Sequence, residues 1–255
     1  MRTAAILPVK RFAHAKQRLG ASVVDQLRLE LARAMVADVL LALHDTDSIE
    51  RTIVVTGEES VAESARGQGA LVVTEDRVGD GQSAAVALGV RRALAEGFER
   101  VLCVPGDCPA LDPTELDELL GADAALLDHH GEDLPPATTV RVAANPVTGG
   151  GRAPEVVIVP DRHGTGTNGL LLTPPDAISP SFGPGSCERH RALALAAGVA
   201  CDVARPSSLL LDIDTGADLA ALRDRLAGTH TRAERTRAVL GQPERTDPLP
   251  LPNRA

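Results

Sequence analysis

The sequence lacks tryptophan and tyrosine altogether, and its aromatic side chains are limited to 3 phenylalanines. Proteins that bind single-stranded nucleic acid or sugars often stack them on aromatic rings, so this scarcity disfavours both kinds of ligand. The formal net charge of −9 argues against a general binder of nucleic acid or of anionic membrane surfaces. A hydrophobic fraction of 44% with so few rings predicts a core of Ala, Leu and Val, which suits buried parallel strands covered by helices.

Cysteine is sparse as well. The chain has 4 cysteines, with no C-x-x-C pair and no histidine at zinc-binding spacing: Cys103, Cys108, Cys187 and Cys201. Dispersed cysteines in a chain of 255 residues indicate reduced thiols and a cytoplasmic protein. The first apolar run, residues 3–9, is too short for the core of a signal peptide or for a membrane span. We therefore expect a soluble, cytoplasmic protein that has neither a membrane nor a nucleic acid as its partner.

Lysine is nearly absent, and its position is informative. Among the 26 basic residues the lysines are Lys10 and Lys16, which share one loop with Arg11 and Arg18. A lysine is a compact point charge that suits contact with a phosphate, although a charge run taken alone is usually a solvated surface loop. The chain has neither a Walker A sequence nor G-x-G-x-x-G, so a triphosphate bound at this loop would depend on side-chain cations.

Short apolar runs alternate with helical patterns along most of the chain. Buried strands are predicted at 3–9, 51–57, 70–76, 100–107, 155–161, 168–174 and 208–215. Helices are predicted at 25–43, 58–67, 81–97, from 113 onward, 185–198 and 216–226. This alternation predicts an α/β fold with a single Rossmann-like sheet, mixed but mostly parallel, and helices on both faces.

The alternation of predicted strands and helices indicates one domain over residues 1–227. A Pro-, Gly- and charge-rich stretch at 128–154 predicts an inserted loop, and the polar, then proline-rich segment 228–255 predicts a partly disordered tail. In open α/β sheets, ligands bind at the carboxyl ends of the strands. The polar residues that follow the predicted strands are therefore the candidates for a site.

Three aspartates follow strands at that edge. Asp107 ends one apolar run, and Asp212 and Asp214 end the run 208–215, where the two-residue period of a strand would turn both to the same side. Such a group of carboxylate oxygens suits Mg²⁺, which also binds substrate phosphates. The other reading is a helix N-cap, because both runs lead into helices, and for Asp214 the two readings have equal weight.

Two glycine-rich stretches complete the polar features. Residues 160–172 read PDRHGTGTNGLLL, and residues 182–190 read FGPGSCERH, with Ser186 as the expected N-cap of a helix. Bare backbone N–H groups, hydroxyls and a helix N-terminus can together hold an anion. Ordinary glycine turns explain the same letters, and neither stretch decides the question alone.

Five segments together resemble the motifs of the phosphoenolpyruvate and 2-phospho-L-lactate guanylyltransferases of coenzyme F(420) biosynthesis: ILPVKRFAHAKQRL, PGDCPAL, DRHGTGTN, FGPGSCERH and LDIDTGADL. The combination of D-R-x-G-T-G-T-N with F-G-P-x-S-x-x-R-H is much more specific than either motif alone. The resemblance implies the fold shared by nucleotide-diphospho-sugar and molybdopterin nucleotidyltransferases. It also implies GTP as the donor substrate, Mg²⁺ as the cofactor and a three-carbon phospho-acid as the acceptor.

The resemblance further implies roles for individual residues. The acceptor contacts would be Thr167, Gly183 and Ser186, with Arg162 as an additional candidate. The metal ligands would be Asp107 and Asp212, to which the strand pattern adds Asp214. The nucleotide-binding candidates are Lys10, Arg11, Lys16, Arg18, Gly81, Gln82 and Ser83. The candidates for catalysis are Lys10, Lys16 and Asp107.

The implied activity is transfer of GMP from GTP to phosphoenolpyruvate or 2-phospho-L-lactate, with release of pyrophosphate and delivery of the product to the next enzyme of the pathway. An Arg- and Ala-rich composition, typical of a high-GC bacterium, favours phosphoenolpyruvate. Two other readings stay open: a sugar- or molybdopterin-type nucleotidyltransferase, and a non-catalytic protein that binds a phosphometabolite. The sequence leaves the acceptor, the role of the 128–154 insertion and a homodimeric state undecided.

Overall fold

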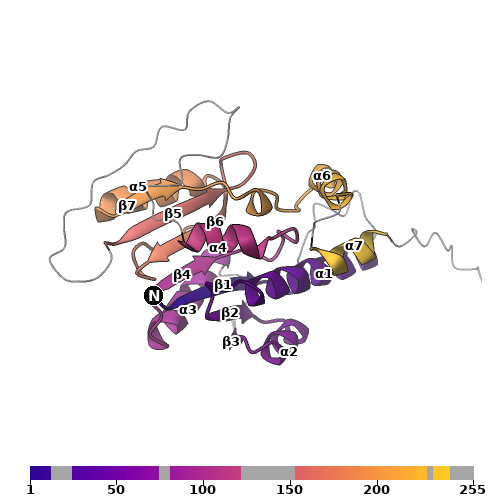
Figure 1. Cartoon of the computed structure of the whole chain (residues 1–255), viewed down its shortest axis with the longest axis horizontal. Helices are drawn as coiled ribbons and strands as arrows, with labels where there is room; N and C mark the ends of the chain where they lie inside the picture. The colour runs from indigo at the N-terminus through magenta and orange to yellow at the C-terminus, as the bar shows by residue number, and fades with distance from the viewer. Residues whose placement is uncertain (13–24, 75–80, 122–152, 229–231, 242–255) are drawn as a thin grey trace, which may run out of the picture.

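The computed structural model describes residues 1–12, 25–74, 81–121, 153–228 and 232–241 (Figure 1). Its strands are β1 (Thr3–Val9), β2 (Arg51–Thr56), β3 (Leu71–Thr74), β4 (Arg100–Cys103), β5 (Glu155–Pro160), β6 (Thr167–Thr173) and β7 (Ala200–Val203). Its helices are α1 (Asp25–His44), α2 (Glu59–Gly67), α3 (Gly81–Ala95), α4 (Pro113–Gly121), α5 (Ser186–Ala197), the 3₁₀ helix η4 (Ser207–Leu209), α6 (Gly216–Leu226) and α7 (Glu234–Leu240). Across these ranges no helix has the length and apolarity that crossing a bilayer requires.

All seven strands form one sheet in the order β3-β2-β1-β4-β6-β5-β7. β1 pairs in parallel with β2 and β4, β2 pairs in parallel with β3, and β5 pairs in parallel with β7. β6 runs antiparallel to its neighbours β4 and β5. The predicted single sheet, mixed but mostly parallel, is confirmed.

Alternate residues of the central strand β1 point to opposite faces, where different helices cover them. Ala5 and Leu7 pack with side chains of α1, α2 and α4, whereas Ala4 and Ile6 pack with side chains of α3 and α5. Helix α3 comes so close to the sheet that a Cβ on Gly89 would stand 2.5 Å from Ile6 Cγ2, so this contact requires glycine. The predicted covering of both faces by helices is confirmed.

A third apolar cluster joins α1, α6 and α7, and Figure 1 shows α7 lying beside α1. The buried carboxylate of Asp38 in α1 accepts the backbone N–H groups of Arg235 and Thr236 at 3.2 and 2.8 Å. These two N–H groups belong to the first turn of α7, which has no partner for them inside the helix. Residues 232–241, which the sequence assigned to a polar tail, are therefore packed on the domain.

The run 208–215 is not a strand, contrary to the sequence-based expectation. Leu209 ends the 3₁₀ helix η4, and its carbonyl accepts a hydrogen bond from the side-chain amide of Asn168 at 2.9 Å. Ile213 donates its N–H to the carbonyl of Asp107 at 3.1 Å. Backbone groups that a sheet ladder would use are thus bonded to a side chain and to a neighbouring loop.

The seventh strand lies instead at β7, which the sequence reading did not identify. Its four residues, ACDV, are too few and too mixed in polarity to give a clear two-residue period. The loop predicted at 128–154 falls almost wholly outside the described residues, as do Lys16 and Arg18 of the basic loop.

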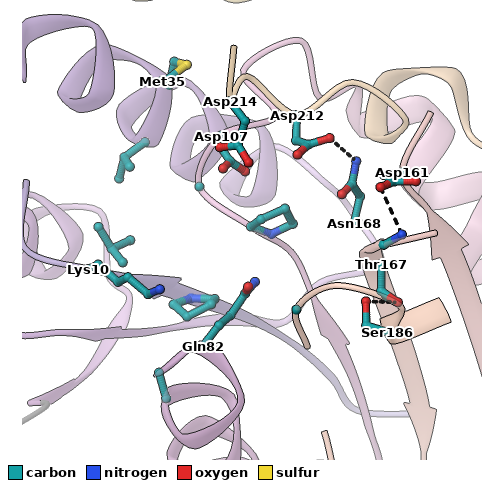
Figure 2. A pocket seen from close by; sticks show the side chains of 18 of the residues that line it. Lys10, Met35, Gln82, Asp107, Asp161, Thr167, Asn168, Ser186, Asp212 and Asp214 are labelled. Atoms are coloured by element: carbon teal, nitrogen blue, oxygen red, sulfur yellow. Dashed lines mark hydrogen bonds between the residues drawn. The ribbon is translucent and has the colours of Figure 1, made fainter. Parts of the chain in front are cut away.

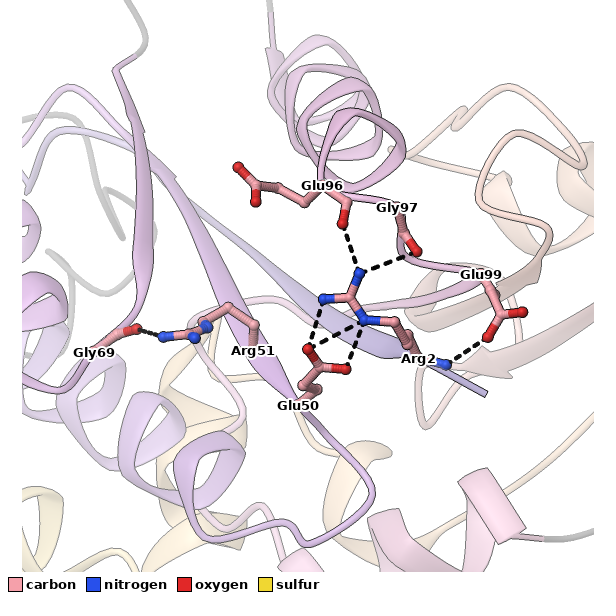
Figure 3. Close-up of polar contacts among 7 residues, drawn as sticks. All are labelled: Arg2, Glu50, Arg51, Gly69, Glu96, Gly97 and Glu99. Carbon is pink, nitrogen blue, oxygen red and sulfur yellow. Dashed lines mark hydrogen bonds and ion pairs between the residues drawn. The ribbon is translucent and has the colours of Figure 1, made fainter.

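The amino ends of the parallel strands carry paired charges (Figure 3). The guanidinium of Arg2, just before β1, binds the carboxylate of Glu50, just before β2, at 2.6 Å. The same guanidinium donates to the carbonyl of Glu96 at 2.7 Å. The backbone N–H of Arg2 donates to the carboxylate of Glu99, just before β4, at 2.8 Å. Opposite charges at this edge of the sheet therefore satisfy one another.

Candidate active site

A cavity of about 480 Å³ lies at the carboxyl ends of β1 and β4 (Figure 2). This volume is ordinary for a small-molecule site. Among the residues that line it are these candidates from the sequence: Lys10, Gln82, Asp107, Thr167, Gly183, Ser186, Asp212 and Asp214. The topology thus brings side chains from distant segments of the chain to one cavity, at the edge of the sheet where ligands were expected.

Asp107, Asp212 and Asp214 lie near one another on one wall of the cavity (Figure 2). The hydrogen bond from the N–H of Ile213 to the carbonyl of Asp107 holds the two segments together. The side chain of Ile213 is buried in the cluster of α1 and α6, and the residues on either side of it both line the cavity. Asp212 and Asp214 therefore share one side, as expected, although they do so on a loop rather than on a strand.

Like charges accumulate on this wall. Burial, and then the negative charge of Asp107, raise the pKa of Asp212, while a hydrogen bond from Asn168 Nδ2 at 3.2 Å opposes that rise. In the part of the chain that the structure describes, no three Asp, Glu, His or Cys side chains are arranged to hold a metal. Mg²⁺ needs fewer, because it binds proteins through one or two carboxylates and takes further oxygens from water and phosphates. The half-buried pair of Asp107 and Asp212 fits that demand, and their assignment as ligands stays a prediction.

The Gly-Thr-Gly-Thr stretch is organised by the side chain of Asp161. Its carboxylate accepts the backbone N–H groups of His163, Thr165 and Gly166 at 3.1, 2.9 and 3.0 Å. A Cβ on Gly166 would stand 2.7 Å from Asp161 Oδ2, so this close approach requires glycine. Of the two readings left open for this stretch, the turn therefore applies to these three N–H groups, which already have an acceptor. The turn presents the side chain of Thr167 to the cavity instead.

Thr167 and Ser186 form the polar centre of a second wall (Figure 2). Both side chains are buried yet line the cavity, and their hydroxyl oxygens lie 3.0 Å apart. Gly185, at φ +71°, is the N-cap of α5, so Ser186 is the first helical residue rather than the expected N-cap. The positive end of the α5 dipole consequently lies at the same corner as the two hydroxyls, together with Gly183. The three residues predicted for the acceptor are thus brought together.

His190 supports this pair, and sequence reasoning gave it no role. Its Nδ1 lies 3.1 Å from Thr167 Oγ1, and its Nε2 accepts the backbone N–H of Ser181 at 2.9 Å. The ring is fully buried and meets the edge of Phe182 at 5.1 Å between centroids. Burial, and then the positive charge of Arg189, lower the pKa of His190 to about 4, so the imidazole is neutral at neutral pH.

Two further residues outside the predicted set hold the walls in place. Asn168 donates its side-chain amide both to the carbonyl of Leu209 and to the carboxylate of Asp212, which ties the second wall to the first. The guanidinium of Arg189 donates to several backbone carbonyls of the loop 181–184. Asn168 and Arg189 each belong to one of the two sequence motifs, but the hydrogen-bond partners of their side chains depend on tertiary structure.

The nucleotide-binding candidates divide by position. Lys10 lines the cavity from the end of β1, and Gln82 lines it from the first turn of α3. Arg11 is exposed and outside the lining, and Gly81 begins α3 at φ +80° without contributing to the wall. Within the described part of the basic loop, Lys10 is thus the cation that reaches the cavity.

Ser83 and Arg162 do not line the cavity. The hydroxyl of Ser83 accepts the backbone N–H of Phe182 at 2.8 Å, which connects α3 to the acceptor-side loop. The guanidinium of Arg162 binds the carboxylate of Asp218 at 2.6 Å, at the start of α6. The geometry therefore gives these two residues structural contacts in place of the ligand contacts predicted from the sequence.

The chain belongs to the nucleotidyltransferases, as a match to a family model shows. A family model for the MobA-like NTP transferase domain matches residues 17–169. A solved structure described as a putative nucleotide-diphospho-sugar transferase from Desulfovibrio desulfuricans G20 has the same fold, with a TM-score of 0.66, 16% identity and coverage of 94% of both chains. The predicted fold type is confirmed, and the enzyme class follows from the family match.

Curated relatives narrow this class to one family. The phosphoenolpyruvate guanylyltransferase of Conexibacter woesei is 44% identical over 248 residues, which cover 97% of this chain and 99% of that protein. The phosphoenolpyruvate guanylyltransferase of Sphaerobacter thermophilus is 34% identical over 222 residues, which cover 87% of this chain and 93% of that protein. The chain belongs to the phosphoenolpyruvate guanylyltransferase family, as the five sequence segments predicted.

Proposed function

We propose that this protein transfers GMP from GTP to phosphoenolpyruvate and releases pyrophosphate. The observation that carries the proposal is that one cavity has two chemically different walls, with Asp107 and Asp212 on one and Thr167 and Ser186 on the other. Carboxylates suit the binding of a triphosphate that is accompanied by a metal ion. Hydroxyl groups suit the binding of a small anion without a metal ion, because they can donate hydrogen bonds to it. A nucleotidyltransferase needs both kinds of subsite, because its two substrates must meet at one phosphorus atom.

The acceptor subsite is the wall at the start of α5. The hydroxyl pair of Thr167 and Ser186 can donate a hydrogen bond to a phosphate oxygen, and the helix dipole favours negative charge at the same corner. Gly183 has φ +109°, a conformation that residues with a Cβ rarely adopt, and it brings bare backbone to the wall. These features suit the phosphate of a compact three-carbon acid.

The donor subsite is the wall formed by the aspartates together with Lys10. Asp107 and Asp212 would hold Mg²⁺, which when bound neutralises phosphate charge. A cation there would also offset the burial of Asp212 and its repulsion from Asp107, which raise the pKa of Asp212 in that order. Lys10 would neutralise charge on the leaving pyrophosphate, and Gln82 lies where it can contact the nucleotide.

The reaction is an in-line substitution at the α-phosphorus of GTP. A phosphate oxygen of the acceptor forms the new bond to that phosphorus, and the bond from the α-phosphorus to the oxygen bridging to the β-phosphorus breaks. The bonding electrons leave with pyrophosphate. No proton has to be removed, because the attacking phosphate oxygen is already ionised. The protein contributes position and charge neutralisation, which supply most of the barrier reduction in reactions of this kind.

We place this reaction in coenzyme F(420) biosynthesis in the cytoplasm, where the next enzyme of the pathway would consume the guanylylated product. The curated relatives carry phosphoenolpyruvate in their names, which supports it as the acceptor over 2-phospho-L-lactate. The chain has no tryptophan or tyrosine on which a sugar could stack, which disfavours a sugar acceptor.

Pyrophosphate release from GTP and Mg²⁺ tests the proposal, with phosphoenolpyruvate, 2-phospho-L-lactate and 3-phosphoglycerate as parallel acceptors. We expect the highest kcat/KM with phosphoenolpyruvate, and little release when ATP or CTP replaces GTP. A preference for 2-phospho-L-lactate would change the acceptor and keep the activity. Absence of pyrophosphate with all three acceptors, from protein that melts cooperatively, would refute guanylyl transfer.

A further inference from the structure

We propose that His190 is a positioning residue that sets the direction of the hydrogen bonds in the acceptor subsite, so that Thr167 and Ser186 present one hydroxyl proton to the ligand. The inference rests on the proposed acceptor site and adds a requirement to it. The bound group must bring an oxygen that accepts a hydrogen bond.

The tautomer of His190 follows from its two partners. Nε2 faces the backbone N–H of Ser181 at 2.9 Å, and a backbone N–H can only donate, so Nε2 must carry the lone pair. A neutral imidazole has its single proton on the other nitrogen, which here is Nδ1. Nδ1 therefore donates to Thr167 Oγ1 at 3.1 Å. The low pKa of the ring agrees with this neutral form.

Counting protons then leaves one without an acceptor inside the protein. The ring N–H and the two hydroxyls supply three protons, of which one forms the bond from His190 to Thr167 and one forms the bond between Thr167 and Ser186. Within the described part of the chain, these hydroxyls have no other hydrogen-bond partner. Ser186 donates to Thr167 Oγ1, as does the ring N–H of His190, so both lone pairs of that oxygen are filled and the proton of Thr167 is the one available. Both side chains line the cavity, so a ligand oxygen can accept that proton.

This arrangement selects a class of ligand. The described lining of the cavity contains one cationic side chain, Lys10, at the end of β1, so anion binding beside α5 depends on neutral donors. The ring N–H of His190 occupies a lone pair of the Thr167 hydroxyl, which therefore points its proton to the cavity. This hydroxyl is a poor acceptor for a ligand that donates a hydrogen bond. An ionised phosphate or carboxylate oxygen, which only accepts, suits the site better than a sugar hydroxyl.

Two substitutions at position 190 separate positioning from packing. In His190→Gln, the side-chain oxygen can stand where Nε2 stands and accept the N–H of Ser181, but nothing donates to Thr167. In His190→Asn, the side-chain amide can stand where Nδ1 stands and donate to Thr167, but the bond to Ser181 is lost. Both variants lose the same ring contact with Phe182, so each serves as the structural control of the other.

We expect His190→Gln to raise the KM for phosphoenolpyruvate about tenfold, the equivalent of one hydrogen bond to a charged group, with the KM for GTP unchanged. His190→Asn should keep the acceptor KM within about twofold of wild type. Equal increases in both variants, or an unchanged KM in His190→Gln, would overturn the inference and leave the ring a packing role.

The ¹⁵N spectrum of histidine side chains in the ligand-free wild-type protein gives a second readout that needs neither variant nor activity. His190, assigned by through-bond correlation among the 7 histidines, should show a protonated Nδ1 and an unprotonated Nε2 at pH 7. The opposite tautomer would overturn the inference even if phosphoenolpyruvate is the acceptor. Conversely, the expected tautomer in a protein that releases no pyrophosphate would refute the proposed function and keep the hydrogen-bond direction.

Discussion

At the amino ends of β1, β2 and β4, opposite charges lie beside one another, whereas at the carboxyl ends three like charges share one wall of a cavity. Arg2 binds Glu50 and two backbone carbonyls at the first edge (Figure 3). At the second edge, burial, then the charge of Asp107 and, least, that of Asp214 raise the pKa of Asp212, whose side chain lies beside theirs (Figure 2). The same strands therefore carry a neutralised edge and a charged one.

Under the proposed function, this difference separates charges that serve stability from charges that serve a ligand. Paired charges at the amino ends need nothing from outside. Clustered carboxylates at the carboxyl ends are unfavourable in the free protein, and a metal-bound nucleotide would relieve their repulsion. Groups with perturbed pKa values that converge on a cavity are typical of functional sites.

The largest effect is expected for Asp107→Asn. Loss of one carboxylate removes a predicted metal ligand, so kcat for pyrophosphate release should fall at least about 100-fold, as for loss of a charge-stabilising group in other active sites. The melting temperature should stay the same or rise, because Asp212 loses a repelling neighbour.

Glu50→Gln is the matched control for that substitution, because it neutralises one carboxylate at the opposite edge of the same sheet. It should leave kcat and both KM values near those of wild type. Near-normal turnover in Asp107→Asn, or equal losses in the two variants, would contradict the division between the edges.

A smaller effect is expected for Ser186→Ala. Removing this hydroxyl opens one lone pair of Thr167, so the Thr167 proton is no longer fixed toward the ligand. The donor wall stays intact, so only the KM for phosphoenolpyruvate should rise, about tenfold. Steady-state kinetics with each substrate varied in turn measure the change. An increase confined to the KM for GTP would move the acceptor to another part of the cavity.

The pH dependence of stability sharpens the comparison further. His190 has a pKa of about 4 in the folded protein and 6.5 when unperturbed, so between these values the unfolded chain binds a proton that the folded chain does not. The contribution of His190 to the free energy of unfolding should therefore be constant above pH 6.5, fall as pH drops from 6.5 to 4, and level off below. Urea denaturation at several pH values measures it, with His190→Gln as the reference that lacks this titration. Parallel profiles for the two proteins would show that the ring is not held neutral.

The smallest effect on activity is expected for Arg2→Ala at the amino ends. Loss of its ion pair and hydrogen bonds should lower the melting temperature, and the difference from wild type should shrink in high salt because the pair is exposed. Turnover by the folded protein should not change. A loss of kcat at a temperature where the variant is fully folded would show that this edge also affects catalysis.

Most of the sheet could be predicted because its strands are short apolar runs that alternate with helical patterns, as in β1 and α1. The strand predicted at 208–215 was wrong because the apolar residues of this segment pack into two different clusters. Leu209 packs against the sheet, and Ile213 packs between α1 and α6. The aspartates beside Ile213 were nevertheless placed on the correct side, since alternation along a chain does not require a ladder of hydrogen bonds.

The candidate site was predictable to the extent that its residues belong to local motifs. Thr167, Gly183 and Ser186 occur in two such motifs and meet in the structure. The roles of Asp161 and His190 could not be predicted, because one closes a turn by accepting backbone N–H groups and the other reaches a residue that lies 23 positions away. The hydrogen bonds that a side chain makes across the fold cannot be inferred from the spacing of residues in the sequence.

Product analysis of wild-type protein with GTP, Mg²⁺ and phosphoenolpyruvate tests the central claim most directly, namely that the protein joins these two substrates by transfer of GMP. Mass spectrometry should find a guanylylated phosphoenolpyruvate, and a coupled assay should find pyrophosphate in an equal amount. Formation of GDP and inorganic phosphate, or pyrophosphate release that does not depend on the acceptor, would contradict the account.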